Sequence, residues 1–543
     1  MSSITERAAS KSPWDTDVTF LTQSFKRSQL NDLLMGPDDG VQATLSALWN
    51  NTTHNLITEY RRRIGNLDRS DKQSKVFYER KRVLQHFHSF LSKEKRFYID
   101  VINRTISLYA LDDYKYTVNA IDSQKEENHS NDMDVDGDDD DDVGRADVSL
   151  DYSNTVAEEG TFDKDTRVWI VYRCLIYIGD LLRYRELYNE DKGRPKAGQH
   201  VRDNGKRRIY TQTLACYKIA KSVKPNEALH FNNMAVVSSY NDDNLGTLYY
   251  YYRCITTSRA PKQPQQLARS NITSILNKAL DDSKKDSTEG GDYNIFITQL
   301  IRTQAMLYLN RDDIQTVTKL VSSSSRLFKK LVDSDTLNAE TISRVITVSI
   351  SLYHHLRTYR QIDVAGSNMS TEVRKSAAHK HLIRLITHLM RSVRNSIEEV
   401  VIDDDSASDD IRLSQLLTTS LRRSLPALRL SMHWLISNID HHLKAKANSK
   451  SNSIPEFWSE MDKFKDTIAD KFSDMHFEKC PYEFSEDEEY FEFEAVKRCK
   501  FYINEVSAEE ARNMRRERHP NEEQFARITD VFGLLDKAVS ING

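Results

Sequence analysis

An aspartate-rich run is the one dense group of metal-binding side chains in this sequence. Eight aspartates lie within residues 132–142. The positions that open an EF-hand calcium loop are filled here by Asp132, Asp134, Asp136 and Gly137. The twelfth position of such a loop requires a bidentate glutamate, but it is Val143, and no pair of helical patterns flanks the run. We therefore expect no metal site in the run, and a disordered loop instead, because the like charges repel and no apolar surface can be buried.

Histidine and cysteine are placed too irregularly for a metal site. The 16 histidines are scattered, and His86 and His88 lie two residues apart, so they point in different directions on a helix. The adjacent pairs at 354–355 and 441–442 meet the same objection. No Cys-x-x-Cys pair occurs among the five cysteines, which are Cys174, Cys216, Cys254, Cys480 and Cys499. We expect neither a zinc site nor disulfides, and hence a reducing compartment.

The sequence also lacks the short motifs that position catalytic groups. It contains no Gly-x-x-x-x-Gly-Lys-[Ser/Thr] or Gly-x-Gly-x-x-Gly phosphate loop, no Gly-x-Ser-x-Gly nucleophile turn and no His-Glu-x-x-His metal helix. Nuclease chemistry needs clustered carboxylates that hold Mg²⁺, and the dense carboxylates are confined to the aspartate-rich run. We therefore predict a protein that is not an enzyme, has no cofactor and takes no small-molecule substrate.

The composition indicates long helices joined by short connections. Glycine and proline number only 16 and 10 among 543 residues, too few for the tight turns of β-sandwiches, propellers or Rossmann-type enzymes. Hydrophobic residues make up 38% and charged residues 29%, a balance typical of helical arrays with solvated outer faces. The formal charge is −4, but outside the aspartate-rich run the chain is weakly basic, with 77 basic and 73 acidic residues. We expect an all-α protein that is compatible with nucleic acid contacts.

Apolar residues recur at helical spacing over most of the chain. Residues 1–15 are polar and expected to be disordered, as are an acidic loop over 120–165 and a basic loop over 189–208. The helical pattern over 168–184 contains Gly179, which predicts the close approach of a neighbouring helix backbone. Later helices are expected over 293–311, 313–333, 338–361, 372–400, 410–445 and 455–472. No signal-peptide core or run of 18 apolar residues occurs, so we expect a soluble protein with no membrane partner.

Two passages follow the pattern of a helix-turn-helix repeat. They cover 210–225 and 233–261 and end in prolines 36 residues apart, with small residues where helices would cross. The spacing predicts a pair of tetratricopeptide units. The second passage contains the run Tyr249 to Tyr252, which either lies in the core or offers rings on which bases stack. An acidic, aromatic strip over 480–493 is expected to pack back on the helices as extended chain.

Three clusters of basic residues are candidate contacts to RNA or to a protein partner. They are Arg61, Arg62 and Arg63; Arg80, Lys81 and Arg82; and Lys206, Arg207 and Arg208. The alternative for the first two clusters is that they belong to solvated helix faces, and arginines in a last helical turn, as expected at 61–63, also complement the helix dipole.

The segment Gly179–Arg185, Gly-Asp-Leu-Leu-Arg-Tyr-Arg, resembles the signature helix of a known family. That family comprises telomerase regulators and nonsense-mediated-decay proteins (Ever Shorter Telomeres one and SMG five, six and seven), and the chain is most similar to the budding-yeast telomerase regulatory subunits. Collinear matches follow in Tyr217–Glu227, Asn232–Ala235, Tyr249–Ile255 and Asn271–Leu280, and the Leu48-Trp49 helix and Pro481–Asp487 are also similar.

The resemblance implies a 14-3-3-like array of tetratricopeptide helices over 16–285. A helical-hairpin domain follows over 286–475, and a C-terminal segment over 476–543, extended and helical, packs on this scaffold. In decay factors of the family a concave groove binds phosphoserine peptides, and Arg183 with Tyr184 occupies the matching position here. The family's second phosphate ligand, a lysine, falls on His54, which is mostly neutral at pH 7. The alternative for Arg183 is an ion pair with Asp180 or Glu186 on its own helix.

The implied function is that of a non-catalytic telomerase regulatory subunit in the nucleus. Such a subunit binds telomerase RNA, the catalytic subunit and a telomeric single-stranded-DNA-binding protein, and it recruits telomerase to chromosome ends. The first alternative is a decay adaptor, also cytoplasmic, that binds phosphoserine in a phosphorylated decay helicase. The second is a generic helical scaffold for protein interactions.

Overall fold

The fold is all-α throughout the part of the chain that the structure describes. The computed structural model describes residues 2–69, 74–122, 162–190, 208–257, 262–282, 291–311, 313–358, 369–401, 409–448, 452–473, 480–496 and 508–542. Within these ranges every element is a helix, and the one β interaction is an isolated bridge between Thr257 and Phe493. The predicted fold class is therefore confirmed. The aspartate-rich run, Lys206 and Arg207 lie outside the described residues.

The contacts divide the chain into two compact units, Met1–Asn241 and Asp242–Gly543. The boundary expected from the resemblance lies later, at 285. In the structure α10 (Asn244–Thr256) and α11 (Lys262–Asp282) pack on α12 (Asp292–Leu309), and α10 also packs on α14 (Ala339–Thr358), so α10 and α11 belong to the second unit. The assignment of 16–285 and 286–475 to two domains stays a prediction. No helix in the described ranges is long and apolar enough to cross a membrane.

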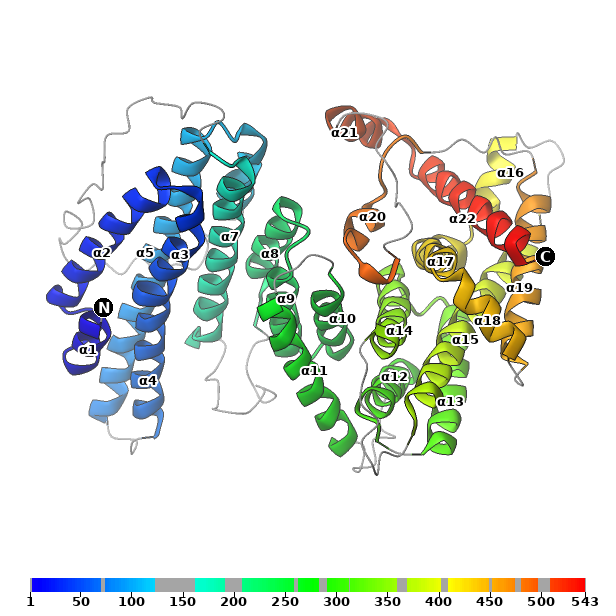
Figure 1. Ribbon diagram of the computed structural model, residues 1–543, viewed down its shortest axis with the longest axis horizontal. Helices are drawn as coiled ribbons and strands as arrows, with labels where there is room; N and C mark the ends of the chain where they lie inside the picture. The colour runs from blue at the N-terminus through cyan, green and yellow to red at the C-terminus, as the bar shows by residue number, and fades with distance from the viewer. Residues whose placement is uncertain are drawn as a thin grey trace. The chain divides into compact units, whose positions relative to one another are not determined.

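Unit 1 is a bundle of long helices that run side by side (Figure 1). Its elements are α1 (Ser2–Ser10), α2 (Thr16–Met35), α3 (Asp38–Leu48), η1 (Trp49–His54), α4 (Asn55–Arg69), α5 (Ser74–Leu108), η2 (Asp112–Tyr114), α6 (Tyr116–Asp122), α7 (Lys164–Leu187), α8 (Thr211–Val223) and α9 (Leu229–Tyr240). The most extensive packing joins α7 to α5 and to α8. Helix α7 is the centre of the unit because it is apolar on nearly all sides, with 14 buried residues.

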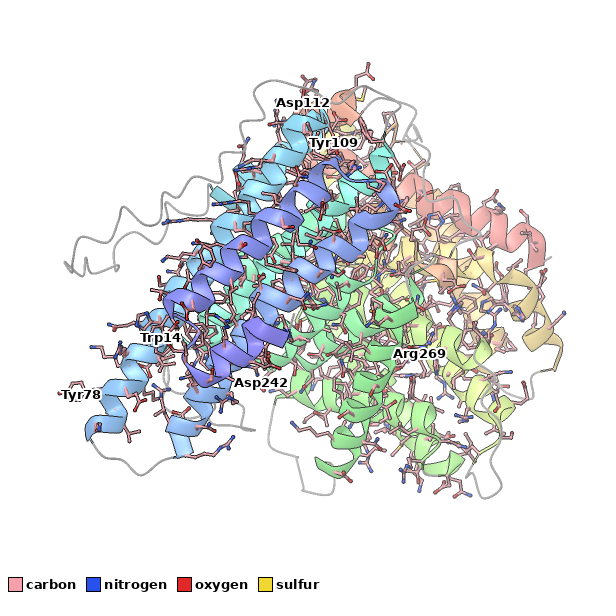
Figure 2. The ribbon with its side chains drawn as sticks, turned by 60° about the vertical axis from the view of Figure 1, so that its left-hand side comes forward. Trp14, Tyr78, Tyr109, Asp112, Asp242 and Arg269 are labelled. Atoms are coloured by element: carbon pink, nitrogen blue, oxygen red, sulfur yellow. The ribbon has the colours of Figure 1, made fainter. Side chains whose placement is uncertain are left out.

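The expectation of a disordered N-terminus over residues 1–15 is wrong. Helix α1 buries Ile4 and Ala8, which lie four residues apart and therefore share one face. The following Trp14 stacks on His86 of α5 with ring centroids 4.6 Å apart, and Figure 2 shows its place beside the helices of unit 1. The side chains of Ile4, Ala8 and Trp14 thus hold this short polar segment against unit 1. Three apolar residues in fifteen are too sparse a pattern to distinguish a docked helix from a disordered tail in the sequence.

Unit 2 stacks helices in a succession of antiparallel neighbours. Its elements are α10 (Asn244–Thr256), α11 (Lys262–Asp282), α12 (Asp292–Leu309), α13 (Ile314–Asp333), α14 (Ala339–Thr358), α15 (Thr371–Glu398), α16 (Asp409–Leu416), α17 (Thr419–Ser437), α18 (Ile439–Asn448), α19 (Ser453–Lys471), α20 (Ser485–Tyr490), η5 (Glu494–Val496), α21 (Ala508–Glu517) and α22 (Pro520–Asn542). The tyrosine run of α10 is buried, with Tyr250 at 9% the most exposed of the four. These rings form core and are not platforms for bases.

The single helix expected over 410–445 is three helices, α16, α17 and α18. Thr418 ends the first break, because its side chain accepts a hydrogen bond from the backbone N–H of Leu421 and so caps the start of α17. Asn438 follows the last residue of α17 and donates to the carbonyl oxygen of Trp434. Polar caps inside an otherwise apolar pattern are easily missed, since Thr and Asn also occur within helices.

The C-terminal strip packs on the helices of unit 2 around a buried arginine. Arg429 of α17 is 4% exposed and donates to Asp487 at 2.9 Å, Glu486 at 2.8 Å and Asp530 of α22 at 2.7 Å. Further along, the hydroxyl of buried Tyr490 lies 3.3 Å from Thr347 of α14. The strip was expected to be extended, but residues 485–490 form the short helix α20.

Candidate functional site

A π-helical turn, η1, determines on which side of the helix the side chain of His54 lies. Helix α3 continues through η1 into α4, and a π turn shifts the register of the side chains that follow it. Trp49, at the start of the turn, is buried and stacks on Tyr177 of α7, with ring centroids 4.2 Å apart. His54, at its end, is exposed. Arg61 follows two helical turns later on the same face of α4.

Helix α7 supplies the second half of the site. Arg183 donates from Nη2 to Oδ1 of Asp180 at 3.0 Å, so its partner on the helix is Asp180 and not Glu186. The same carboxylate oxygen accepts from the hydroxyl of Tyr217 at 2.8 Å and from Nδ2 of Asn233 at 3.3 Å. Three donors from α7, α8 and α9 therefore fix the position of Asp180.

The two helices meet at the ring of Tyr184. The guanidinium of Arg183 lies 4.5 Å from the ring centroid and that of Arg61 lies 5.4 Å from it. Arg61 also donates from Nε to the hydroxyl of Tyr188 at 3.2 Å. We call His54, Arg61, Asp180, Arg183 and Tyr184 the α4–α7 site. The structure thus brings together His54, Arg183 and Tyr184, as the resemblance implied, and adds Arg61.

The charges of the α4–α7 site favour an anion. Although His54 is exposed as a whole, partial desolvation of its imidazole lowers the pKa of this group; the charge of Asp180 opposes the shift and the charges of Arg61 and Arg183 add to it, so the neutral form is favoured. Burial alone would lower the pKa of Arg183, but the charge of Asp180 raises it well above its ordinary value. The site therefore contains two guanidinium groups and one carboxylate, which leaves a net positive charge. A guanidinium fork matches the oxygens of a phosphate or carboxylate group.

The two arginines that follow Arg61 on α4, Arg62 and Arg63, have structural partners. The carboxylate of Glu59 accepts from Nε of Arg62 and from Nε of Arg63, both at 2.7 Å. Arg63 also donates to the carbonyl oxygen of Ala8 at 2.9 Å and so holds the end of α1. Arg62 is about half exposed. The cluster of residues 61–63 is therefore divided between the α4–α7 site and the packing of α1.

The second basic cluster, Arg80 to Arg82, is divided between a buried residue and two exposed ones. Arg80 was expected to contact RNA or a partner, but its side chain is 5% exposed and is ion-paired with Asp68 at 2.6 Å and with Glu190. This expectation is wrong, because Arg80 lies on the inner face of α5. Lys81 and Arg82, one and two residues later, are exposed.

The third cluster is described only at Arg208, which donates to the carbonyl oxygens of Glu186 and Asn189 at the end of α7. In the ranges that the structure describes, no group of three or more His, Cys, Asp or Glu side chains is placed to hold a metal ion. Tyr188, Tyr217 and Asn233 were not predicted from the sequence as site residues. The signal for two of them was present, because Tyr217 and the Asn232–Ala235 segment lie in the motifs that carry the resemblance.

Comparison with known proteins identifies a family and a related fold. A family model described as "Telomerase activating protein Est1" matches residues 43–189. A second, described as "Est1 DNA/RNA binding domain", matches residues 213–499, which is more than half of the chain. A solved structure described as "Crystal structure of Est1 and Cdc13" has the same fold, with a TM-score of 0.64 and 15% sequence identity, and the match covers 100% of this chain and 96% of that one.

Curated relatives come from two functional groups. The chain is 23% identical over 189 residues to the nonsense-mediated mRNA decay factor SMG7 of Danio rerio, across 35% of this chain and 14% of the relative. It is 22% identical over 220 residues to the telomere elongation protein est1 of Schizosaccharomyces pombe, across 40% of this chain and 36% of the relative. The matches thus span between about a seventh and about a third of the length of these relatives. The resemblance predicted from the Gly179–Arg185 motif is confirmed: the chain belongs to the Est1 family.

Proposed function

We propose that this chain is a non-catalytic telomerase regulatory subunit that acts at telomeres in the nucleus. It binds telomerase RNA and the catalytic subunit, it binds a telomeric single-stranded-DNA-binding protein, and it thereby recruits telomerase to chromosome ends. The observation that carries this proposal is the pair of Est1 family matches, one described as telomerase activating and the other as DNA/RNA binding. The solved structure of similar fold is described as Est1 with Cdc13, which supports a partner of that kind.

The charges of unit 1 favour the telomerase role over the decay role. His54 is neutral where the phosphoserine-binding relatives place a lysine, and Asp180 already offsets the charge of Arg183. These features weaken a phosphoserine pocket. Exposed basic residues such as Lys81 and Arg82 remain for contacts to phosphates of a nucleic acid.

The test is a native purification of the tagged chain from cells of its source organism. Telomerase RNA, the telomerase catalytic subunit and the decay helicase are then quantified in the purified material. We expect telomerase RNA to be enriched, and we expect the purified chain to bind this RNA with an affinity that falls steeply as salt rises. Enrichment of the helicase without telomerase RNA would overturn the proposal.

The α4–α7 site favours a decay adaptor as the second candidate. Arg61 and Arg183 lie against the same tyrosine ring and offer two guanidinium groups to one anion. The relative from Danio rerio is named a decay factor. Under this alternative a phosphoserine peptide binds, its unphosphorylated form does not, and Arg183→Glu abolishes binding. Arg185→Glu is the matched control, because Arg185 is exposed on the same helix two residues away.

A further inference from the structure

The first turns of α5 expose two large aromatic rings. Phe77 is 55% exposed and Tyr78 is 71% exposed, and their rings meet edge to face with centroids 5.9 Å apart. Figure 2 shows Tyr78 at the outer end of the helix, directed away from the body of unit 1. Phe87, on the same helix, is by contrast fully buried. The core of the unit therefore does not use these two rings.

Basic residues alternate with the two rings around this end of the helix. At about 100° per residue, the order around the helix is Phe77, Lys81, Tyr78, Arg82 and Lys75. Lys75, Lys81 and Arg82 are all exposed. Lys81 lies one turn after Phe77 and Arg82 one turn after Tyr78, so each ring has a cation beside it. We call these five residues the α5 aromatic–basic face.

The surrounding charges keep this face positive. Glu79 is exposed at its edge and offsets one of the three cations. Further along α5, Lys93 and Arg96 are exposed, whereas Glu94 is turned inward with its side chain 6% exposed and forms an ion pair with Lys26. The inward turn of this carboxylate leaves Lys93 and Arg96 as a second group of exposed cations, about three turns further along the same helix.

We propose that the α5 aromatic–basic face binds an unpaired RNA strand. Successive bases stack on Phe77 and Tyr78, and the phosphates on either side contact Lys75, Lys81 and Arg82. Exposed rings interleaved with cations fit a single strand because unpaired bases offer their faces, whereas a duplex keeps them stacked inside. The proposal rests on the proposed function, which supplies an RNA as ligand. The family match described as DNA/RNA binding begins only at residue 213, so this contact is separate from it.

The test is fluorescence anisotropy with the full chain and a labelled, unstructured single-stranded RNA of about 15 nucleotides. Phe77→Ala with Tyr78→Ala is expected to weaken binding about tenfold or more, because stacking on each ring is lost. Log affinity falls as log salt rises, and Lys81→Gln with Arg82→Gln is expected to make this fall less steep. The magnitude of the slope should decrease by about 1.4, the value for two phosphate contacts to a single strand. Phe20→Ala and Arg27→Gln are matched controls, since both residues are exposed on α2.

Each outcome separates this inference from the proposed function. If the unmodified chain binds RNA and neither α5 double variant changes the affinity or the salt slope, the inference is overturned while the proposed function stands. If the unmodified chain does not bind this single-stranded RNA, the inference is overturned, while the proposed function is decided separately by the enrichment of telomerase RNA in the native purification. Equal affinity for single-stranded DNA or duplex RNA of the same sequence overturns the assignment to an RNA strand. Unchanged RNA binding with loss of a protein partner assigns the face to that partner and overturns the inference.

Discussion

The ring of Tyr217 on α8 lies directly against the α-carbon of Gly179 on α7. A Cβ at position 179 would be 2.4 Å from Cε1 of this ring, far inside van der Waals contact. A neighbouring helix backbone was expected to approach closely at Gly179, but the group that takes this space is the side-chain ring of Tyr217. The contact also places the hydroxyl of Tyr217 on Asp180, at 2.8 Å, so the packing of the two helices and the α4–α7 site depend on the same glycine.

Gly179→Ala is expected to destabilise the protein although alanine is the better helix former. The helix preference favours alanine by about 1 kcal/mol. The fully buried ring of Tyr217 has no room to move, and overpacking of this kind costs about 1–3 kcal/mol. Thermal unfolding should show a lower Tm for this variant. Gly65→Ala on α4 is the control, because the nearest atom is 3.9 Å away, and it should leave Tm unchanged or raise it. An equal or higher Tm for Gly179→Ala would contradict the role of this contact.

His54→Lys is expected to strengthen the binding of a phosphoserine peptide to the α4–α7 site. Position 54 is exposed, so a lysine there stays charged and adds a cation beside Arg61 and Arg183. Arg61→Gln should act in the opposite direction and weaken binding about tenfold, because a charge-assisted hydrogen bond is lost. Both effects are measurable by titration calorimetry with a phosphorylated peptide and its unphosphorylated form. Equal binding by both variants would mean that these side chains do not face the phosphate.

Arg429→Met is expected to destabilise unit 2 by about 3–5 kcal/mol, since it leaves buried carboxylates without their partner. Burial alone would raise the pKa of Glu486, but the hydrogen bond from Arg527 and the charge of Arg429 lower it to about 2. Urea unfolding measures the loss, and limited proteolysis should cut the segment around α20 sooner. Arg515→Met is the control, because Arg515 pairs with Glu488 at the surface and such pairs contribute about 1 kcal/mol or less. A loss no larger than that of the control would show that Arg429 does not hold the segment.

The free energy of unfolding is expected to fall as pH is lowered from about 6.5 towards 4. Burial lowers the pKa of His381 to about 4, and the same holds for His355, His379 and His388. In this pH range the unfolded chain therefore binds protons that the folded chain does not bind, which favours unfolding.

Replacing one such histidine checks this expectation. His381→Gln should lower the slope of the unfolding free energy against pH by up to about 1.4 kcal/mol per pH unit, the contribution of one proton. His519→Gln, at an exposed position, is the control for the exchange of histidine for glutamine. The slopes are compared between variants, so a uniform loss of stability does not affect the result. Identical slopes for all three proteins would contradict the assignment.

The sequence by itself determined the all-α class, the family and the two residues around which the α4–α7 site is built. Low glycine and proline content and helical spacing are properties of the chain alone, and the Gly179–Arg185 motif carries Arg183 and Tyr184 together. The structure had no part in these inferences because each depends on neighbours along the chain.

Only the tertiary structure decided which basic residues are available to a ligand. Arg80 and Arg82 look alike in the sequence, yet two residues on a helix correspond to about 200° of rotation, so one is buried in ion pairs while the other is exposed. The partner of Arg61 is likewise decided by the tertiary structure, because Arg61 contacts Tyr188, which lies 127 positions later in the chain. Which face of a helix is covered, and what lies across from it, depends on packing between distant segments, and helical periodicity does not contain that information.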